Sequence, residues 1–271
     1  MKRYRVCNVF LDTTRNIFRH PAKGQMKKVK KDIRASLILR YGEQNFDEKF
    51  ARFMELEKPA ISVIAEHTYL LEDICSSYVQ GNLFSALTGA CCLGERIFND
   101  ILFKVMDDFK SSVHFKYMYD RGSVNDWEKA IKILSDWDLI DKETKKKYKE
   151  LYKLRTDSVH FQKKDQDFAK MSLKAINIVN FIINKLFTIG PRRKDILIYF
   201  EVPGELFIRK DAEKDPIVKA FFIPCSILVG PRYKTVTGNK PGQFKIIDEK
   251  EYEKKEISDA QFVKLRNEFK G

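Results

Sequence analysis

Residues 82–106 of the 271-residue chain read NLFSALTGACCLGERIFNDILFKVM, and this stretch decides the class of fold. Its apolar residues recur at steps of three and four, which places them on one side of a helix. This stripe consists of Leu83, Leu87, Ala90, Leu93, Ile97, Ile101 and Val105. Small residues near the stripe, among them Ala86, Gly89 and Cys91, let a second helix approach closely. The stretch therefore predicts a long helix that packs against other helices.

Helical periodicity continues on both sides of this stretch. The further helices predicted around it lie at 61–79, 127–137, 141–159 and 168–187. Ser123 and Asp126 are expected to cap the second of these, and Asp141 the third. Because the connections are short, residues 60–189 are predicted to form a four- or five-helix bundle.

The two flanks of the bundle have different patterns. Residues 1–59 form a basic N-terminal segment, with an edge strand expected within 3–10 and helices at 27–41 and 45–56. After residue 190 the pattern changes to short β-prone runs, at 196–202, 205–208, 220–229 and 243–247. Ser258 and Gln261 then open a final helix that reaches about residue 269. The predicted fold class is mainly α, a helical bundle with a small C-terminal α+β domain at 190–271.

The charge of the chain is concentrated near its start. The net charge is +13, and residues 1–34 hold 11 basic and 2 acidic residues, whereas residues 35–189 hold 23 of each. Such a basic segment usually contacts phosphate without reading sequence. We therefore expect a nucleic-acid partner, with candidate contacts at Lys27, Lys28, Lys30 and Lys31. The alternative is a solvated helix face that aids solubility.

Several classes of protein are excluded by what the sequence lacks. The first residues have no apolar run, so no secretory signal is expected. The most apolar stretch, 172–189, is interrupted by Lys174 and several asparagines, which argues against a membrane span. The five cysteines contain no C-x-x-C pair and the four histidines are isolated, so we expect neither a disulfide framework nor a metal site. A Gly-rich phosphate loop is also missing. The expectation is a cytoplasmic protein that uses no metal and no cofactor.

The residues that suggest chemistry are Arg155 and His160, near the end of a predicted helix. A neutral imidazole can take the proton of a ribose 2′-hydroxyl, because its reference pKa lies near neutrality. A guanidinium stays charged and can hold the scissile phosphate through two hydrogen bonds. Attack by the 2′-oxygen leaves a 2′,3′-cyclic phosphate, and this route is closed to DNA. The pair therefore predicts metal-independent cleavage of RNA.

Helix geometry constrains this pair. Residues five apart on an ideal helix diverge by roughly 140°, so Arg155 and His160 share a face only if the helix breaks between them or Arg155 swings round. A second copy of the motif from a partner subunit relaxes this constraint. Thr156 and Asp157 do lie on the face of His160, where Asp157 is placed to orient the imidazole. A second Arg-to-His spacing of the same length joins Arg15 to His20, but it precedes Pro21 and lies outside the predicted bundle.

Two segments of the bundle resemble the HEPN family (higher eukaryotes and prokaryotes nucleotide-binding). They are GNLFSALTGA at 81–90 running into GERI at 94–97, and LRTDSVHF at 154–161. The likeness covers about residues 61–187 and implies an HEPN-like bundle. It further implies a metal-independent endoribonuclease that forms a homodimer with two motifs in one site. Such enzymes serve in toxin–antitoxin or antiviral (antiphage) defence systems, with an antitoxin or sensor protein as partner.

The resemblance assigns roles by position. Arg155 is the phosphate-binding residue and His160 the catalytic histidine. Thr156 stands where active members usually carry Asn, Asp or His, and Asp157 is the candidate substitute. Glu95 and Arg96, on the helix expected to pack nearby, are supporting candidates.

The same residues allow a second interpretation. Arg155 can pair with a carboxylate such as Glu95, and His160 can cap the C-terminus of its helix. The protein would then be a catalytically inactive HEPN-like module that binds nucleic acid, a nucleotide or a protein partner.

Overall fold

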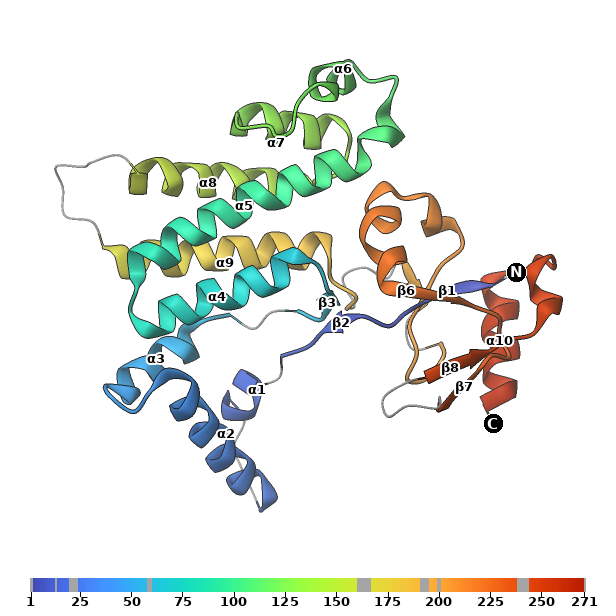
Figure 1. Ribbon diagram of the computed structural model, residues 1–271, viewed down its shortest axis with the longest axis horizontal. Coiled ribbons are helices and arrows are strands. Elements are labelled where there is room, and N and C mark those ends of the chain that lie inside the picture. Colours follow the sequence, from blue (N-terminus) through green and yellow to red (C-terminus); the bar gives the residue numbers. More distant parts are fainter. Residues whose placement is uncertain are drawn as a thin grey trace. The chain divides into compact units, whose positions relative to one another are not determined.

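The chain is mainly helical and divides into two compact units (Figure 1). The computed structural model describes residues 2–12, 14–19, 24–57, 60–159, 167–190, 195–198, 201–237 and 244–270. The helical unit is Phe10–Thr188, and the α+β unit combines Met1–Val9 with Ile189–Gly271. The fold is therefore the mainly α class with a small α+β part that the sequence predicts.

The helical unit is built around α5 (Leu83–Val105), the helix of the opening sequence stretch. This helix packs against α4 (Glu66–Gln80), α7 (Trp127–Asp136), α8 (Lys142–Val159) and α9 (Phe168–Leu186) (Figure 1). The predicted stripe of α5 is buried except for its first member, which is half-buried. The helical bundle is thus confirmed, and burial of this stripe is the main favourable term in its folding.

Aspartate side chains fix where the bundle helices begin. The Asp126 carboxylate accepts the backbone N–H of Lys129 at 3.0 Å at the start of α7. The Asp141 carboxylate accepts that of Thr144 at 2.7 Å at the start of α8, as predicted. Each bond satisfies a donor that the first helical turn leaves without a partner. The expected pairing of Ser123 with Asp126 is wrong, because the Ser123 hydroxyl donates to Asn125 instead.

Short elements precede the bundle and connect its helices. Before it come α1 (Thr14–Arg19), α2 (Gln25–Tyr41) and α3 (Phe46–Glu55), the last of which packs on α4. Between α5 and α7 lie η1 (Met106–Phe109) and α6 (Val113–Tyr119).

The helix predicted at 61–79 begins later than expected, at Glu66. Residues Ser62–Val63 instead form strand β3, which pairs with β2 (Val9–Phe10). The Val63 N–H also donates to the Phe187 carbonyl at 3.0 Å. These tertiary bonds hold the backbone extended and override the local helical pattern.

The α+β unit contains a four-stranded antiparallel sheet in the order β4-β5-β1-β6. Its strands are β4 (Leu197–Ile198), β5 (Phe207–Ile208), β1 (Arg3–Val6) and β6 (Ser226–Val229). The strand expected near the N-terminus is therefore present, but its expected edge position is wrong, because β1 pairs on both sides. Strand β1 pairs with strands that lie about 200 residues later in the chain, so the N-terminal residues belong to the C-terminal domain.

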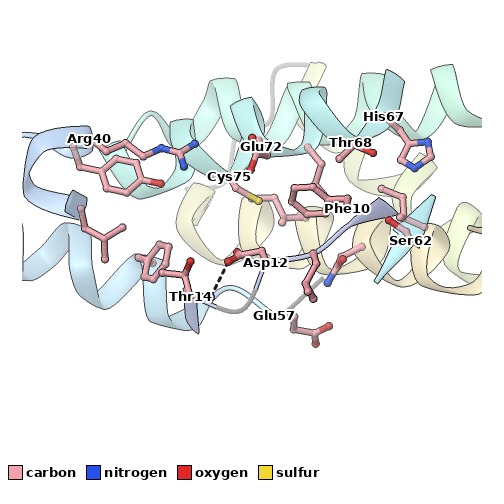
Figure 2. A pocket seen from close by; sticks show the side chains of 18 residues that line it. Phe10, Asp12, Thr14, Arg40, Glu57, Ser62, His67, Thr68, Glu72 and Cys75 are labelled. Carbon is pink, nitrogen blue, oxygen red and sulfur yellow. Dashed lines mark hydrogen bonds between the residues drawn. The ribbon is translucent and has the colours of Figure 1, made fainter. Parts of the chain in front are cut away.

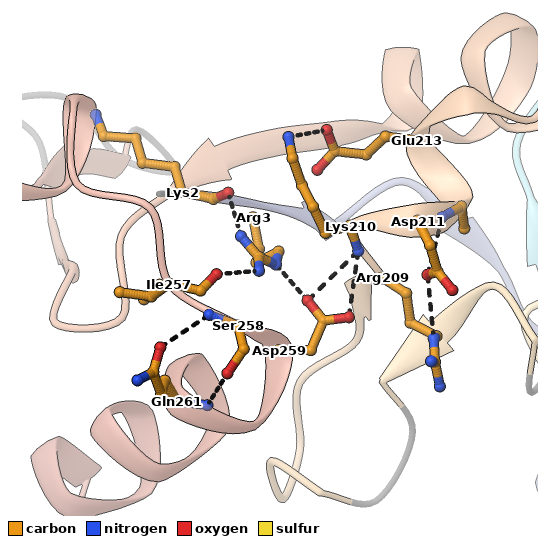
Figure 3. A network of polar contacts seen from close by, with 11 residues as sticks. Lys2, Arg3, Arg209, Lys210, Asp211, Glu213, Ile257, Ser258, Asp259 and Gln261 are labelled. Carbon is orange, nitrogen blue, oxygen red and sulfur yellow. Dashed lines mark hydrogen bonds and ion pairs between the residues drawn. The ribbon is translucent and has the colours of Figure 1, made fainter.

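Helix α10 (Asp259–Lys270) covers the core of this unit. The predicted capping box at its start is confirmed, with Ser258 N–H donating to Gln261 at 3.0 Å and Gln261 N–H donating to Ser258 at 3.2 Å (Figure 3). Phe262 then enters the core, where its ring lies 4.9 Å from that of Phe207.

The Arg3 side chain ties β1 to this helix (Figure 3). It is fully buried, and its Nε donates to Asp259 at 2.6 Å while Nη2 donates to the Ile257 carbonyl at 2.8 Å. The same Asp259 carboxylate accepts the Lys210 backbone N–H. A buried charge is stable only when it is paired in this way.

The run 220–229, predicted as β-prone, is a strand only at its end. It starts in the π-helical turn η4 (Val218–Phe222) and the 3-10 turn η5 (Ile223–Cys225). Asp215 explains this, because its carboxylate accepts the Val218 N–H at 3.0 Å and Pro216 follows it as a helix-starting residue. A cap and a proline outweigh the β propensity of the aromatic residues here.

The described part of the α+β unit also contains a hairpin and two short turns. The hairpin joins β7 (Lys234–Thr237) to β8 (Phe244–Ile247), and the turns are η3 (Asp211–Lys214) and η6 (Lys250–Glu253). Strand β8 lies within the run predicted at 243–247, whereas β7 was not predicted.

The boundaries of the units differ from the predicted domains 1–59, 60–189 and 190–271. The division at Thr188 and Ile189 lies beside the second predicted boundary. Residues 1–59 are not a separate segment, because β1 pairs inside the α+β unit and α3 packs on α4 inside the helical unit.

Candidate functional site

Helix α8 positions the arginine of the predicted site. Leu151 and Leu154 point into the bundle and are buried, which fixes the rotation of the helix about its axis. Arg155 follows directly and lies at the border between this buried face and solvent, with 39% of its side chain exposed. The guanidinium is thus held by the bundle yet within reach of a ligand.

Glu95 of α5 is the partner of this arginine. Its Oε2 lies 3.5 Å from Arg155 Nε and also accepts the Trp127 indole N–H at 3.0 Å. The Trp127 ring stacks on Tyr152 with centroids 5.6 Å apart and lies under the guanidinium at 6.0 Å. The predicted proximity of Glu95 to Arg155 is therefore present.

The residues after Arg155 continue the helix. The Thr156 hydroxyl donates to the Tyr152 carbonyl at 3.0 Å, and the Ser158 hydroxyl donates to the Arg155 carbonyl at 2.9 Å. Asp157 is half-buried. Helix α8 runs unbroken to Val159. Up to Val159 the helix therefore lacks the break that would bring Arg155 onto the face predicted for His160.

Both candidate histidines lie outside the residues that the structure describes. His160 follows the last described residue of α8, and His20 of the second Arg-to-His spacing follows α1.

Arg96 does not join Arg155. Its guanidinium forms an ion pair with Glu66 of α4, and both side chains are mostly exposed. The two adjacent candidates on α5 are thus divided between neighbours, Glu95 toward α8 and Arg96 toward α4.

The four predicted lysine contacts lie on α2. Lys27, Lys28 and Lys31 are exposed, whereas Lys30 is half-buried and its Nζ donates to the Phe18 carbonyl at 3.3 Å. In Figure 1, α2 and α8 lie on opposite sides of the helical unit. The α2 lysines and Arg155 therefore do not form one continuous site.

A second basic row lies on α8 itself, and the sequence reasoning missed it. It consists of Lys142, Lys146, Lys149 and Lys153, which we call the α8 lysine row; all four are exposed and have no ion-pair partner among the described residues. Steps of four, three and four place them on one helix face over about 16 Å. The spacing was readable from the sequence.

The acidic residues of α8 do not neutralise this row. Glu143 pairs with Lys185 at 2.9 Å, and Glu150 pairs with Lys147 at 3.3 Å. The row therefore keeps its positive charge. Its last member, Lys153, precedes Arg155 by two positions, and residues two apart diverge by about 160° around a helix, so Arg155 lies on a different face from the row.

In the described part of the chain, no group of three or more His, Cys, Asp or Glu side chains is arranged to hold a metal ion. None of the helices described there combines the length and the apolar character that crossing a membrane requires. No protein-family model, curated protein or solved structure matches the chain. The geometry of the site itself therefore carries the functional argument.

Proposed function

We propose that the protein is a metal-independent endoribonuclease of the HEPN type. The α8 lysine row binds the RNA backbone, Arg155 holds the scissile phosphate and His160 takes the proton of the 2′-hydroxyl. The observation that carries this proposal is the half-exposed Arg155, held beside Glu95 and Trp127, and the uncompensated lysine row on another face of the same helix adds positive charge for binding the RNA backbone. Lysine and arginine contacts to phosphate provide most sequence-independent affinity for nucleic acids.

The remaining parts of the proposal follow from the resemblance. Two subunits form a homodimer in which two Arg–His motifs share one site, and an antitoxin or sensor protein controls its activity. The exposed lysines of α2 add phosphate contacts away from that site.

The test of the chemistry is cleavage of total RNA in the presence of EDTA. Arg155→Ala removes the stabilisation of charge on the phosphate, so we expect a loss of about 100-fold or more. His160→Ala removes the proton acceptor, with an expected loss of about 100- to 10,000-fold. His20→Ala is the matched control and should cleave like the wild type. Inactivity of the wild-type protein, or a loss only in the His20 variant, would refute this assignment.

The test of the lysine row is salt-dependent binding of single-stranded RNA, measured by fluorescence anisotropy. Replacing Lys146, Lys149 and Lys153 by Gln removes three phosphate contacts, so the slope of log K against log salt should decrease by about 2. The same change at Lys27, Lys28 and Lys31 is the charge-matched comparison. It removes phosphate contacts away from the site, so it should also reduce the salt slope but leave cleavage at saturating RNA unchanged. Full cleavage and affinity in the α8 variant would contradict the proposal.

A second candidate function is favoured by the pairing of Arg155 with Glu95. If this pair is only structural, the protein is a catalytically inactive HEPN-like module that binds nucleic acid, a nucleotide or a protein partner. Glu95→Gln separates the two functions, because it can keep the Trp127 hydrogen bond while removing the charge that competes with phosphate. If the protein is an enzyme, the variant should bind RNA several-fold more tightly than the wild type. If it is an inactive module, the variant should bind RNA as the wild type does, and neither protein should cleave it.

A further inference from the structure

The helical unit contains a cavity that is separate from the Arg155 site. Its volume is about 250 Å³, and it lies among the segment after β2, α2, α3, α4 and α9 (Figure 2). Since one water molecule takes about 30 Å³ of liquid, the cavity has room for roughly eight waters or one small organic molecule.

The middle of the cavity is apolar. Leu37, Phe53, Leu71 and Ile183 line it, each from a different helix and each otherwise buried in the unit. Walls of this kind favour the apolar body of a ligand over water.

The charges around this apolar middle are unbalanced. Among the described residues that line it, Asp12, Glu57 and Glu72 bring three carboxylates and Arg40 brings one guanidinium, with Glu57, Glu72 and Arg40 exposed to solvent. Within the described residues neither Glu57 nor Glu72 has an ion-pair or hydrogen-bond partner for its side chain. One Asp12 oxygen accepts the Thr14 N–H at 2.8 Å. The excess of negative charge beside apolar walls attracts a cation.

His67 supplies a polar group that lacks a partner. It lines the cavity with only 5% of its surface exposed, and its Nε2 is buried without a hydrogen bond from any described residue. Burial, reinforced by the charge of Lys104, lowers its pKa to about 4, so the ring is neutral at pH 7. In Figure 2, His67 and Arg40 lie at opposite ends of the cavity. A buried polar atom of this kind normally has a partner, and a ligand would provide one.

We propose that this cavity binds a small organic amine, a cationic nitrogen carried on an aromatic or aliphatic body. The apolar body fills the space between the helices, the ammonium group faces the carboxylates and the His67 ring bonds a polar atom of the ligand. This site is independent of the proposed RNA cleavage, because Arg155 and the α8 lysine row do not line it.

Isothermal titration calorimetry on the full chain tests the class of ligand. The probes are phenethylamine, phenethyl alcohol and hydrocinnamate, which share a phenyl ring and differ in charge. We expect the amine to bind about tenfold more tightly than the alcohol, with the carboxylate weakest. Tightest binding by hydrocinnamate, or no saturable binding by any probe, would overturn the proposal.

Two charge-neutralising variants locate the site. Glu72→Gln should weaken phenethylamine binding by about three- to tenfold and leave phenethyl alcohol unchanged. Glu128→Gln, an exposed carboxylate on α7 that does not line the cavity, is the matched control and should have no effect. If both variants weaken phenethylamine binding equally, the amine is attracted by the charge of the whole surface, and the proposed site is refuted. Arg40→Gln should increase the affinity for phenethylamine, and a loss of affinity in this variant would also refute the proposed site.

Discussion

Glu95 serves two donors at once, the Trp127 indole and the Arg155 guanidinium. The indole bond is the shorter of the two, at 3.0 Å, and it holds the carboxylate in place. The arginine contact is longer, at 3.5 Å, and its guanidinium is partly exposed. Ion pairs of this exposure typically contribute no more than about 1 kcal/mol. A phosphate that offers two acceptor oxygens can therefore displace Glu95 from Arg155 while the indole bond stays intact.

His67 makes the stability of the helical unit depend on pH. The folded pKa is about 4 against 6.5 in the unfolded chain, because burial disfavours the charged ring. Between these values the unfolded chain binds more protons, so the free energy of unfolding falls as the pH is lowered from 7 to 4. The difference corresponds to about 3 kcal/mol.

The measurement is urea denaturation followed by tryptophan fluorescence, since both tryptophans, Trp127 and Trp137, lie in the helical unit. His67→Phe keeps the ring contact with Phe187 and removes the titrating group. Its loss of stability over this pH range should be smaller than that of the wild type. Identical slopes in the two proteins would contradict the assignment.

The Arg155–Glu95 contact and the cavity around His67 differ in how well the sequence predicts them. The contact of Arg155 with Glu95 was predictable, because helical spacing and the family resemblance place both on packed helices. The cavity around His67 was not, because its walls come from helices and strands that are far apart in the sequence. Periodicity shows which face of a helix is buried, but not where packed helices leave space between them.

Close packing of α5 against its neighbours depends on small side chains. At Gly94 a Cβ atom would fall inside contact distance of Leu151 Cδ2 on α8, and Leu151 is fully buried. Gly94→Ala gains about 1 kcal/mol of helix propensity. Overpacking costs about 1–3 kcal/mol, so we expect a net loss of roughly 1 kcal/mol.

Urea denaturation measures this loss. Cys92→Ala, at an exposed position of the same helix, is the matched control and should change the free energy of unfolding by less than about 0.5 kcal/mol. A Gly94 variant more stable than the wild type would show that α8 yields to the added methyl group.

The elements that were predicted correctly are those determined by residues close together in the sequence. The long helix at 82–106 and the capping box of Ser258 and Gln261 are both present, because each depends on residues a few positions apart. The predictions of a β-prone run over 220–229 and of a helix starting at residue 61 were wrong. A local cap decided the first, and pairing with distant backbone decided the second.

For the whole molecule, the division into two units predicts separate responses to substitution. Arg3 is fully buried in the α+β unit and bonds Asp259 and Ile257. Arg3→Ala leaves these acceptors without their donor, at an expected cost of about 3 kcal/mol. We therefore expect faster amide hydrogen exchange, by about 100-fold, in peptides of β5, β6 and α10.

Peptides of α5 and α8 report the helical unit and should exchange as in the wild type. Lys28→Ala, an exposed position in the N-terminal segment, is the control and should alter neither unit. Equal acceleration in both units of the Arg3 variant would refute their independence.

The paired position of β1 also sets an order for folding on the ribosome. The helical unit needs residues up to Thr188, whereas the sheet around β1 needs strands and a helix that follow Ile189. At about 5–20 residues per second, β1 emerges well before the strands on either side of it exist. The bundle can thus fold while β1 is still without its neighbouring strands, and the four-stranded sheet can form only after the C-terminal strands have been synthesised.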